Sequence, residues 1–98
     1  MAKVTYSELA KSDLKDIYRY TYTTFGLDQA DKYDSDIKSS GQTAAMFPRL
    51  GRDYTTQKGS EFKRYNSGRH VIFYVAEEGG IFIIRILHGR MDFDRQLD

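Results

Sequence analysis

The hydrophobic residues of this chain follow two different periods, and the order of those periods limits the folds that are possible. In the first half they recur every three or four residues, which is the period of an amphipathic α-helix. In the second half they form short runs separated by glycine-containing turns, which is the pattern of β-strands. Helices followed by strands predict an α+β fold in which the helices pack on one small antiparallel sheet.

Two helices are expected, joined as a hairpin. Ser7 can cap the first helix, Gly26 can end it, and Asp28 can cap the second helix, which Pro48 ends. The apolar face of the first helix reads Ala10, Leu14, Ile17, Thr21 and Phe25. The apolar face of the second helix reads Ala30, Tyr33, Ile37, Gly41, Ala44 and Phe47. This spacing is typical of core packing, and we expect these residues to face the sheet.

Short β-prone segments flank the two helices. Residues 4–6 predict an N-terminal strand, and residues 49–59 predict a long polar loop. Residues 61–65, 69–77 and 81–88, with turns at 66–68 and 78–80, predict an antiparallel meander. The last two strands are apolar on both faces, and the helical hairpin can cover only one of them. The other face therefore needs the C-terminal tail, a second copy of the chain or a partner.

Composition bounds the range of functions. The 98 residues predict a single domain over residues 1–98, and the net charge of +1 argues against direct nucleic-acid binding, which depends on many contacts to phosphates. Without cysteine, and with two histidines, the chain offers no disulfide and little basis for a metal or cofactor site. No apolar run is long enough to span a membrane and no signal peptide is apparent, so we expect a cytoplasmic protein without membrane contact.

One arginine lies inside an apolar strand. Arg85 interrupts the run from Ile81 to Leu87, where a guanidinium costs free energy unless it is paired. It is expected to extend out of the sheet toward solvent, to pair with a carboxylate such as Asp92 or Glu61, or to bind a phosphate or an acidic partner. Seven of the eight arginines lie after Pro48, so a recognition surface is expected in the second half of the chain.

An ordered set of residues resembles the ParE toxins of bacterial type II toxin–antitoxin systems, which belong to the RelE/ParE superfamily. The set extends over nearly the whole chain, and the terminal Arg85-Ile86-Leu87-His88 and Met91-Asp92 make it specific as an ordered set. It also includes Ala10, Asp13-Leu14, Ile17, Tyr20, Gly26, Gln29-Ala30, Tyr33, Pro48, Gly51-Arg52 and His70-Val71-Ile72-Phe73-Tyr74. The resemblance implies the RelE/ParE fold, an α-hairpin on a small antiparallel sheet. It also implies a toxin that inhibits DNA gyrase by binding, without catalytic residues, and that is neutralised by a ParD-like antitoxin.

Two groups of residues are candidates for these contacts. The target-binding surface is expected among Arg52, Arg64, Arg69, Arg85, His88, Arg90, Met91 and Asp92. The antitoxin groove is expected to border Leu14, Ile17, Tyr18 and Tyr33, because an amphipathic helix can dock on a helical hairpin.

Two alternatives remain open. The first is a RelE-like ribosome-dependent mRNA endonuclease, in which His88 with Glu61 or Tyr65 would move protons and Lys63, Arg64, Arg85 or Arg90 would stabilise the phosphate. The tail, residues 89–98, argues against it, because it has neither tyrosine nor histidine and carries three aspartates. The second is a toxin-like module that binds an antitoxin and lacks a target. His70 and His88 are each expected to be strand histidines hydrogen-bonded to a neighbour.

Overall fold

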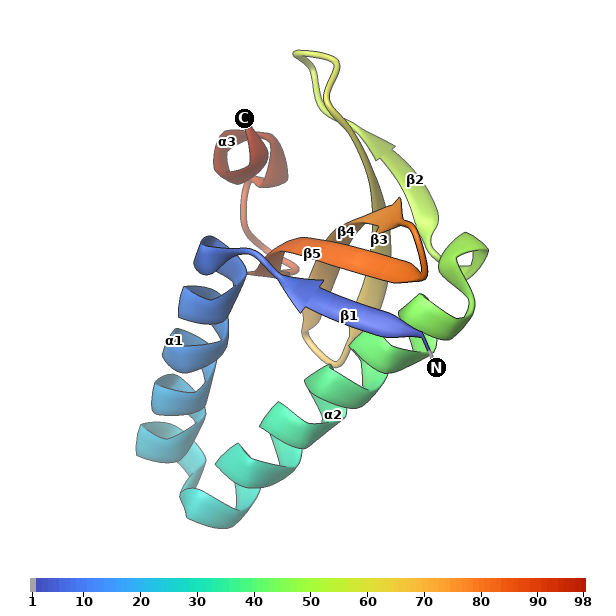
Figure 1. Cartoon of the computed structure of the whole chain (residues 1–98). Coiled ribbons are helices and arrows are strands. Elements are labelled where there is room, and N and C mark those ends of the chain that lie inside the picture. The colour runs from blue at the N-terminus through green and yellow to red at the C-terminus, as the bar shows by residue number, and fades with distance from the viewer. Residues whose placement is uncertain (1) are drawn as a thin grey trace.

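Two helices joined by a single glycine form the hairpin in the computed structural model, which describes residues 2–98 (Figure 1). Helix α1 (Glu8–Phe25) begins at Ser7, whose Oγ accepts a 3.0 Å hydrogen bond from the amide of Ala10. Gly26, with a φ of 94° that favours glycine, ends α1 and directly precedes α2 (Leu27–Met46). The predicted cap at Asp28 is wrong, because α2 already begins at Leu27 and Asp28 lies in its first turn.

Five strands form one sheet in the order β1, β5, β4, β3, β2. The predicted antiparallel meander corresponds to β3 (Glu61–Ser67), β4 (His70–Glu77) and β5 (Gly80–His88). Strand β1 (Lys3–Tyr6) pairs in parallel with β5, so the sheet is mixed. Lys3 lies opposite Gly80, and a Cβ at Gly80 would overlap the carbonyl of Lys3. The predicted α+β class is confirmed.

The segment predicted as a loop, residues 49–59, contains regular structure, and that prediction is wrong in part. A short 3-10 helix, η1 (Pro48–Leu50), leads into β2 (Arg52–Thr55), which pairs with β3 as an edge strand. The hydroxyl of Tyr74 accepts a 3.2 Å hydrogen bond from the amide of Gly51 and donates one of 2.8 Å to the carbonyl of Pro48. A buried tyrosine therefore fixes the path of the chain from the helices into the sheet.

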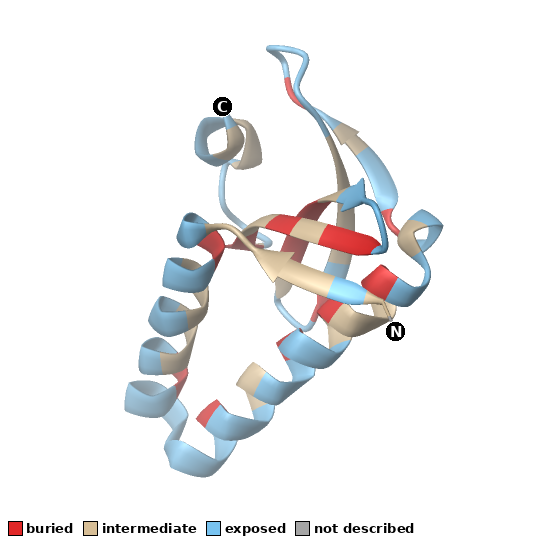
Figure 2. Ribbon diagram, viewed as in Figure 1, coloured by how far each residue is buried: buried red, intermediate tan, exposed pale blue. Residues whose placement is uncertain are grey.

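The helical hairpin covers one face of the sheet, where the main core lies (Figure 2). The core residues of α2, β4 and β5 that are at most 2% exposed include Ile37, Ile72, Tyr74, Ile81, Ile83 and Ile86. The helix positions predicted to face the sheet are buried or half-buried, apart from Phe25 and Phe47, which are 64% and 59% exposed. Phe25 is the last residue of α1, next to the glycine that joins the helices. Phe47 is already outside α2, with a φ of −133°, so the helical period does not place its side chain.

The C-terminal tail covers part of the second face of the sheet. Phe93 and Leu97 of helix α3 (Phe93–Leu97) pack against Val71, Phe73 and Leu87. Asp94 of α3 accepts hydrogen bonds from the Tyr54 hydroxyl and, at 2.8 Å, from the amide of Gln57. Of the three covers expected for this face, the C-terminal tail is therefore the one that the structure contains. No helix within residues 2–98 has both the length and the apolar character needed to cross a bilayer.

Candidate functional site

Arg85 is held inside the molecule by Asp13. Its Nε and one terminal nitrogen donate to the two carboxylate oxygens of Asp13 at 2.8 and 2.9 Å. The amide of Ile86 donates to the same carboxylate at 2.9 Å, and the side chains of Arg85 and Asp13 are 14% and 12% exposed. The predicted partners Asp92 and Glu61 are wrong, because Asp92 caps α3 and Glu61 is exposed in β3. Arg85 therefore ties β5 to α1 and is engaged within the fold.

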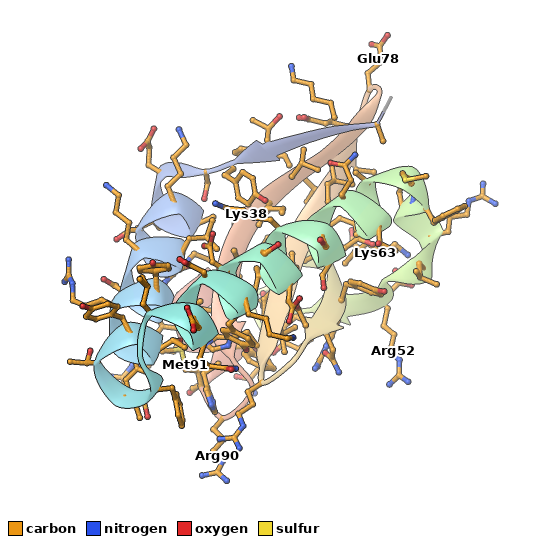
Figure 3. All side chains as sticks on the ribbon, turned by 90° about the horizontal axis from the view of Figure 1, so that it is seen from below. Lys38, Arg52, Lys63, Glu78, Arg90 and Met91 are labelled. Carbon is orange, nitrogen blue, oxygen red and sulfur yellow. The ribbon has the colours of Figure 1, made fainter. Side chains whose placement is uncertain are left out.

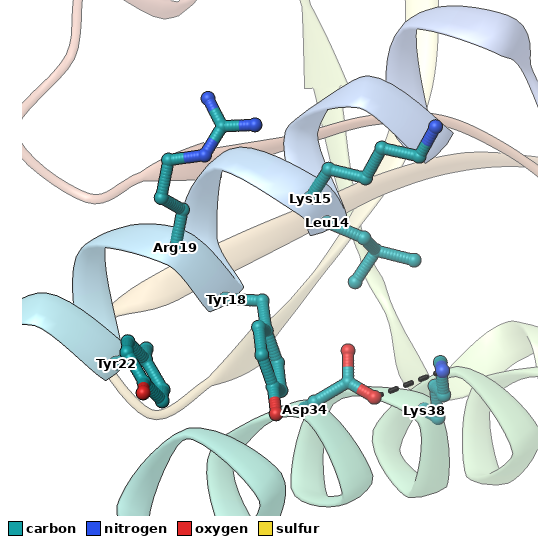
Figure 4. A pocket seen from close by; sticks show the side chains of 7 residues that line it. All are labelled: Leu14, Lys15, Tyr18, Arg19, Tyr22, Asp34 and Lys38. Atoms are coloured by element: carbon teal, nitrogen blue, oxygen red, sulfur yellow. Dashed lines mark ion pairs between the residues drawn. The ribbon is translucent and has the colours of Figure 1, made fainter. Parts of the chain in front are cut away.

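A shallow groove runs between the two helices of the hairpin (Figure 4). Leu14, Tyr18 and Tyr22 form an apolar stripe along α1, four residues apart. Four charged residues complete what we call the hairpin groove: Lys15, Arg19, Asp34 and Lys38. Its volume is about 550 Å³. The stripe has the spacing that presents one continuous face of a helix.

The hairpin groove carries more positive than negative charge. Lys38 forms a 2.9 Å ion pair with Asp34, and the hydroxyl of Tyr18 donates a 2.6 Å hydrogen bond to Asp31. This hydrogen bond raises the pKa of Tyr18 above its ordinary value. Lys15 and Arg19 have no ion-pair partner within residues 2–98. Two uncompensated cations therefore flank an apolar stripe.

A second hollow lies between the hairpin and the end of the sheet, and we call it the turn cleft. Its volume is about 570 Å³. The helices contribute Asp16, Ile17, Tyr20, Thr21, Phe25, Gln29 and Tyr33. The turn from β3 to β4 and the end of β5 contribute Gly68, Arg69, His70, His88 and Met91. Segments from opposite halves of the chain thus form one site.

Tyr33 joins the helices to the turn that carries Arg69. Its hydroxyl accepts a 3.1 Å hydrogen bond from the amide of Arg69 and lies 2.5 Å from Nδ1 of His70. Gly68, with a φ of 59°, passes so close that a Cβ there would lie 2.7 Å from the Tyr33 ring. The turn can therefore seat against Tyr33 only with glycine at this position.

The two histidines of the turn cleft are cross-strand neighbours. His70 and His88 are paired in register between β4 and β5, with ring centroids 5.3 Å apart. Nδ1 of His70 faces the Tyr33 hydroxyl, and Nδ1 of His88 accepts a 3.1 Å hydrogen bond from the amide of Arg90. Because a ring nitrogen that accepts a hydrogen bond carries no proton, the contact with Arg90 places a proton on Nε2 of His88. Each histidine has a hydrogen-bonded neighbour, as predicted.

Burial keeps His70 uncharged at neutral pH. It lowers the pKa of His70 to about 4, and the neighbouring His88 contributes in the same direction. A buried imidazole loses hydration that favours the charged form, which is why its pKa falls. His70 is therefore a neutral residue in the lining of the turn cleft.

The predicted site residues divide among several places. Of the target-binding candidates, Arg69, His88 and Met91 line the turn cleft, and Arg90 lies beside them (Figure 3). Arg52 and Arg64 face each other across β2 and β3, where Arg64 lies 5.3 Å from the ring centroid of Phe93, and Asp92 caps α3. Of the antitoxin candidates, Leu14 and Tyr18 line the hairpin groove, whereas Ile17 and Tyr33 line the turn cleft.

Sequence reasoning missed several members of the two hollows. Tyr20, which is 68% exposed, falls outside the predicted apolar face of α1, and Phe25 was assigned to the core. The only sequence feature that could have indicated these two residues is that both are large aromatic residues near the end of α1. Asp13 could not be identified as the partner of Arg85, because the two residues lie 72 positions apart.

The sequence is similar to a defined toxin family over most of its length. Residues 4–93 match the family described as ParE toxin of type II toxin-antitoxin system, parDE. The chain is 37% identical over 92 residues to Toxin ParE1 of Mycobacterium tuberculosis strain H37Rv, with 93% of each chain covered. It is 34% identical over 87 residues to Toxin ParE1 of Caulobacter vibrioides, with 88% of each chain covered.

The fold is also similar to a solved structure. A chain from the chromosomal ParDE TA system of P. aeruginosa aligns with a TM-score of 0.71. The alignment covers 90% of this chain and 96% of that chain at 17% sequence identity. At that identity the likeness concerns the fold alone.

Proposed function

The chain belongs to the ParE toxin family of type II toxin–antitoxin systems, and from this membership we propose that it inhibits DNA gyrase by binding. Binding of the toxin would block replication in the cytoplasm, and a ParD-like antitoxin would neutralise it. No covalent step is needed for this activity, so the residues that matter are those that make contacts.

The hairpin groove is the observation that carries the antitoxin part of the proposal. An apolar stripe of Leu14, Tyr18 and Tyr22 on one helix face is suited to receive the apolar side of another amphipathic helix. Lys15 and Arg19 beside the stripe favour a partner helix with carboxylates at its edges. We therefore assign the antitoxin contact to this groove, and Ile17 and Tyr33 to the opposite side of the hairpin.

The arrangement of the histidines supports binding over RNA cleavage. A general acid or base works best with a pKa near the operating pH, whereas the pKa of His70 is lowered to about 4. His88 uses Nδ1 to accept from the amide of Arg90. Arg85, whose side chain is 14% exposed, is paired with Asp13. These three engagements argue against proton transfer by the two histidines and against phosphate binding by Arg85.

Plasmid supercoiling by purified gyrase tests the proposal directly. Increasing amounts of the folded toxin should reduce supercoiling, and cleaved plasmid should accumulate if the toxin traps gyrase on DNA. Addition of a ParD-like antitoxin that binds the toxin should restore supercoiling. Unchanged supercoiling at saturating toxin would contradict the proposal, and toxin-dependent cleavage of mRNA on ribosomes would favour the RelE-like alternative.

A further inference from the structure

We propose that the turn cleft is the surface that holds the protein target of this toxin, and that it takes an apolar side chain next to a carboxylate. This inference rests on the proposed function, because it assigns a site and a chemistry to the binding step. Three features carry it: the apolar walls of the cleft, its hydrogen-bond donors and its separation from the hairpin groove.

The walls of the turn cleft hold large apolar side chains that are left exposed. Tyr20, Phe25 and Met91 are 68%, 64% and 47% exposed, and all three line this one hollow. They come from α1 and from the segment after β5, so the chain brings them together only in the folded state. Clustered exposed apolar residues around a hollow are typical of a site for a partner side chain.

The turn cleft has hydrogen-bond donors beside its apolar walls. Nε2 of His88 carries a proton because its Nδ1 accepts from the amide of Arg90, and Arg69 adds a guanidinium at the turn. Asp16 on α1 is the one carboxylate that lines the cleft. Donors beside an apolar wall match a carboxylate that follows or precedes an apolar side chain.

A protein segment fits this chemistry better than a nucleic acid. Arg69 is the one lysine or arginine among the residues that line the cleft. Affinity for a phosphate backbone depends on several cations acting together. The cleft instead combines aromatic walls with a single cation, which is typical of a pocket for a protein side chain.

The turn cleft and the hairpin groove lie on different flanks of α1. Successive residues of a helix are rotated by about 100°, so Tyr20 and Tyr22 point about 200° apart. Tyr20 lines the turn cleft and Tyr22 lines the hairpin groove. Figure 3 shows the same separation from below, with Lys38 of the groove and Met91 of the cleft on opposite sides of α2. Target and antitoxin can therefore be tested with separate substitutions.

Two phenylalanines provide a matched test. Phe25 and Phe47 are exposed to similar extents at helix ends, but only Phe25 lines the turn cleft. Phe25→Ala, and separately Tyr20→Ala, should weaken gyrase inhibition by about tenfold or more, since truncating an aromatic anchor often has an effect of this size. Phe47→Ala should act like the unsubstituted toxin. Circular dichroism and antitoxin binding verify that each variant is folded.

Growth arrest on expression provides a second readout that does not depend on the identity of the target. Folded Phe25→Ala and Tyr20→Ala toxins that inhibit gyrase and arrest growth at full strength would overturn the cleft assignment and leave gyrase inhibition standing. An unsubstituted toxin that arrests growth without affecting gyrase would overturn the proposed target, while reduced arrest by the two variants would still support the cleft. Binding of labelled single-stranded RNA that Tyr20→Ala abolishes would overturn the assignment to a protein segment.

A substitution of Arg69 tests whether the turn cleft prefers a carboxylate. Arg69→Gln removes the guanidinium and keeps the backbone amide that donates to Tyr33. It should weaken gyrase inhibition severalfold. It should also make the inhibition less sensitive to salt, because the attraction between the guanidinium and a carboxylate, which salt screens, is lost. Arg49→Gln, in η1, is the matched control and should not change either property. Equal salt sensitivity in the Arg69 variant and the unsubstituted toxin would overturn the carboxylate preference.

Discussion

At the scale of single residues, Asp13 has the largest predicted effect on stability. It accepts hydrogen bonds from Arg85 and from the amide of Ile86, and its side chain is almost fully buried. Asp13→Ala leaves a buried guanidinium without a counter-charge, which should lower the free energy of unfolding by about 3–5 kcal/mol. Urea unfolding measures the change.

A surface ion pair supplies the control for Asp13. Lys32 and Asp36 pair at 2.9 Å on the exposed side of α2, with side chains 70% and 54% exposed. Asp36→Ala should lower the free energy of unfolding by about 0.5 kcal/mol or less, because solvent already screens that pair. Similar losses in the two variants would contradict the structural role assigned to the Asp13–Arg85 pair.

His70 should make stability depend on pH. Its pKa is about 4 in the folded chain, against an ordinary value of about 6.5 when unfolded. Between these values the unfolded chain binds more protons, so the free energy of unfolding should fall as the pH falls from about 6.5 to about 4. His70→Gln should flatten this part of the pH profile measured by urea unfolding. Parallel profiles for the variant and the unsubstituted protein would contradict the prediction.

At the scale of elements, α1 should determine the charge preference of the antitoxin contact. Lys15→Glu together with Arg19→Glu places two carboxylates beside the apolar stripe of the hairpin groove. The antitoxin should then bind at least about tenfold more weakly, mainly through slower association at low salt. Isothermal titration and stopped-flow binding measure the two effects. Lys58→Glu, outside both hollows, is the control. If it weakens antitoxin binding equally, the effect comes from the overall charge of the toxin and the assignment to the groove is contradicted.

The elements also differ in how far sequence could predict them. The two helices and the meander have strong periods, and both were predicted. Strand β2 was missed because Arg52, Asp53 and Thr55 are exposed on the sheet edge and only Tyr54 gives an apolar signal. The turn cleft could not be predicted as a unit, because it combines residues from both halves of the chain, and local periodicity contains no such long-range information.

At the scale of the whole molecule, the contact between β1 and β5 closes the fold. A Cβ at Gly80 would overlap the Lys3 carbonyl, so Gly80→Ala should displace β1 and expose its amides to hydrogen exchange. Gly89→Ala is the control, since its nearest neighbour would be the Arg69 carbonyl at 3.4 Å, an ordinary contact. That substitution should be neutral or stabilising by about 0.5 kcal/mol, because alanine has less freedom when unfolded. Equal exchange in β1 of both variants would contradict this account.

The pairing of β1 with β5 also has a consequence for synthesis on the ribosome. Strand β5, which contacts β1, α1 and β4, is the last strand of the chain. At about 5–20 residues per second, the ribosome needs about 4–16 s to make the first 80 residues. During that interval neither the helical hairpin nor β1 has its partner strand. A chain that lacks β5 therefore cannot assemble the turn cleft, which needs His88 and Met91, and the sheet is complete only once this strand has emerged.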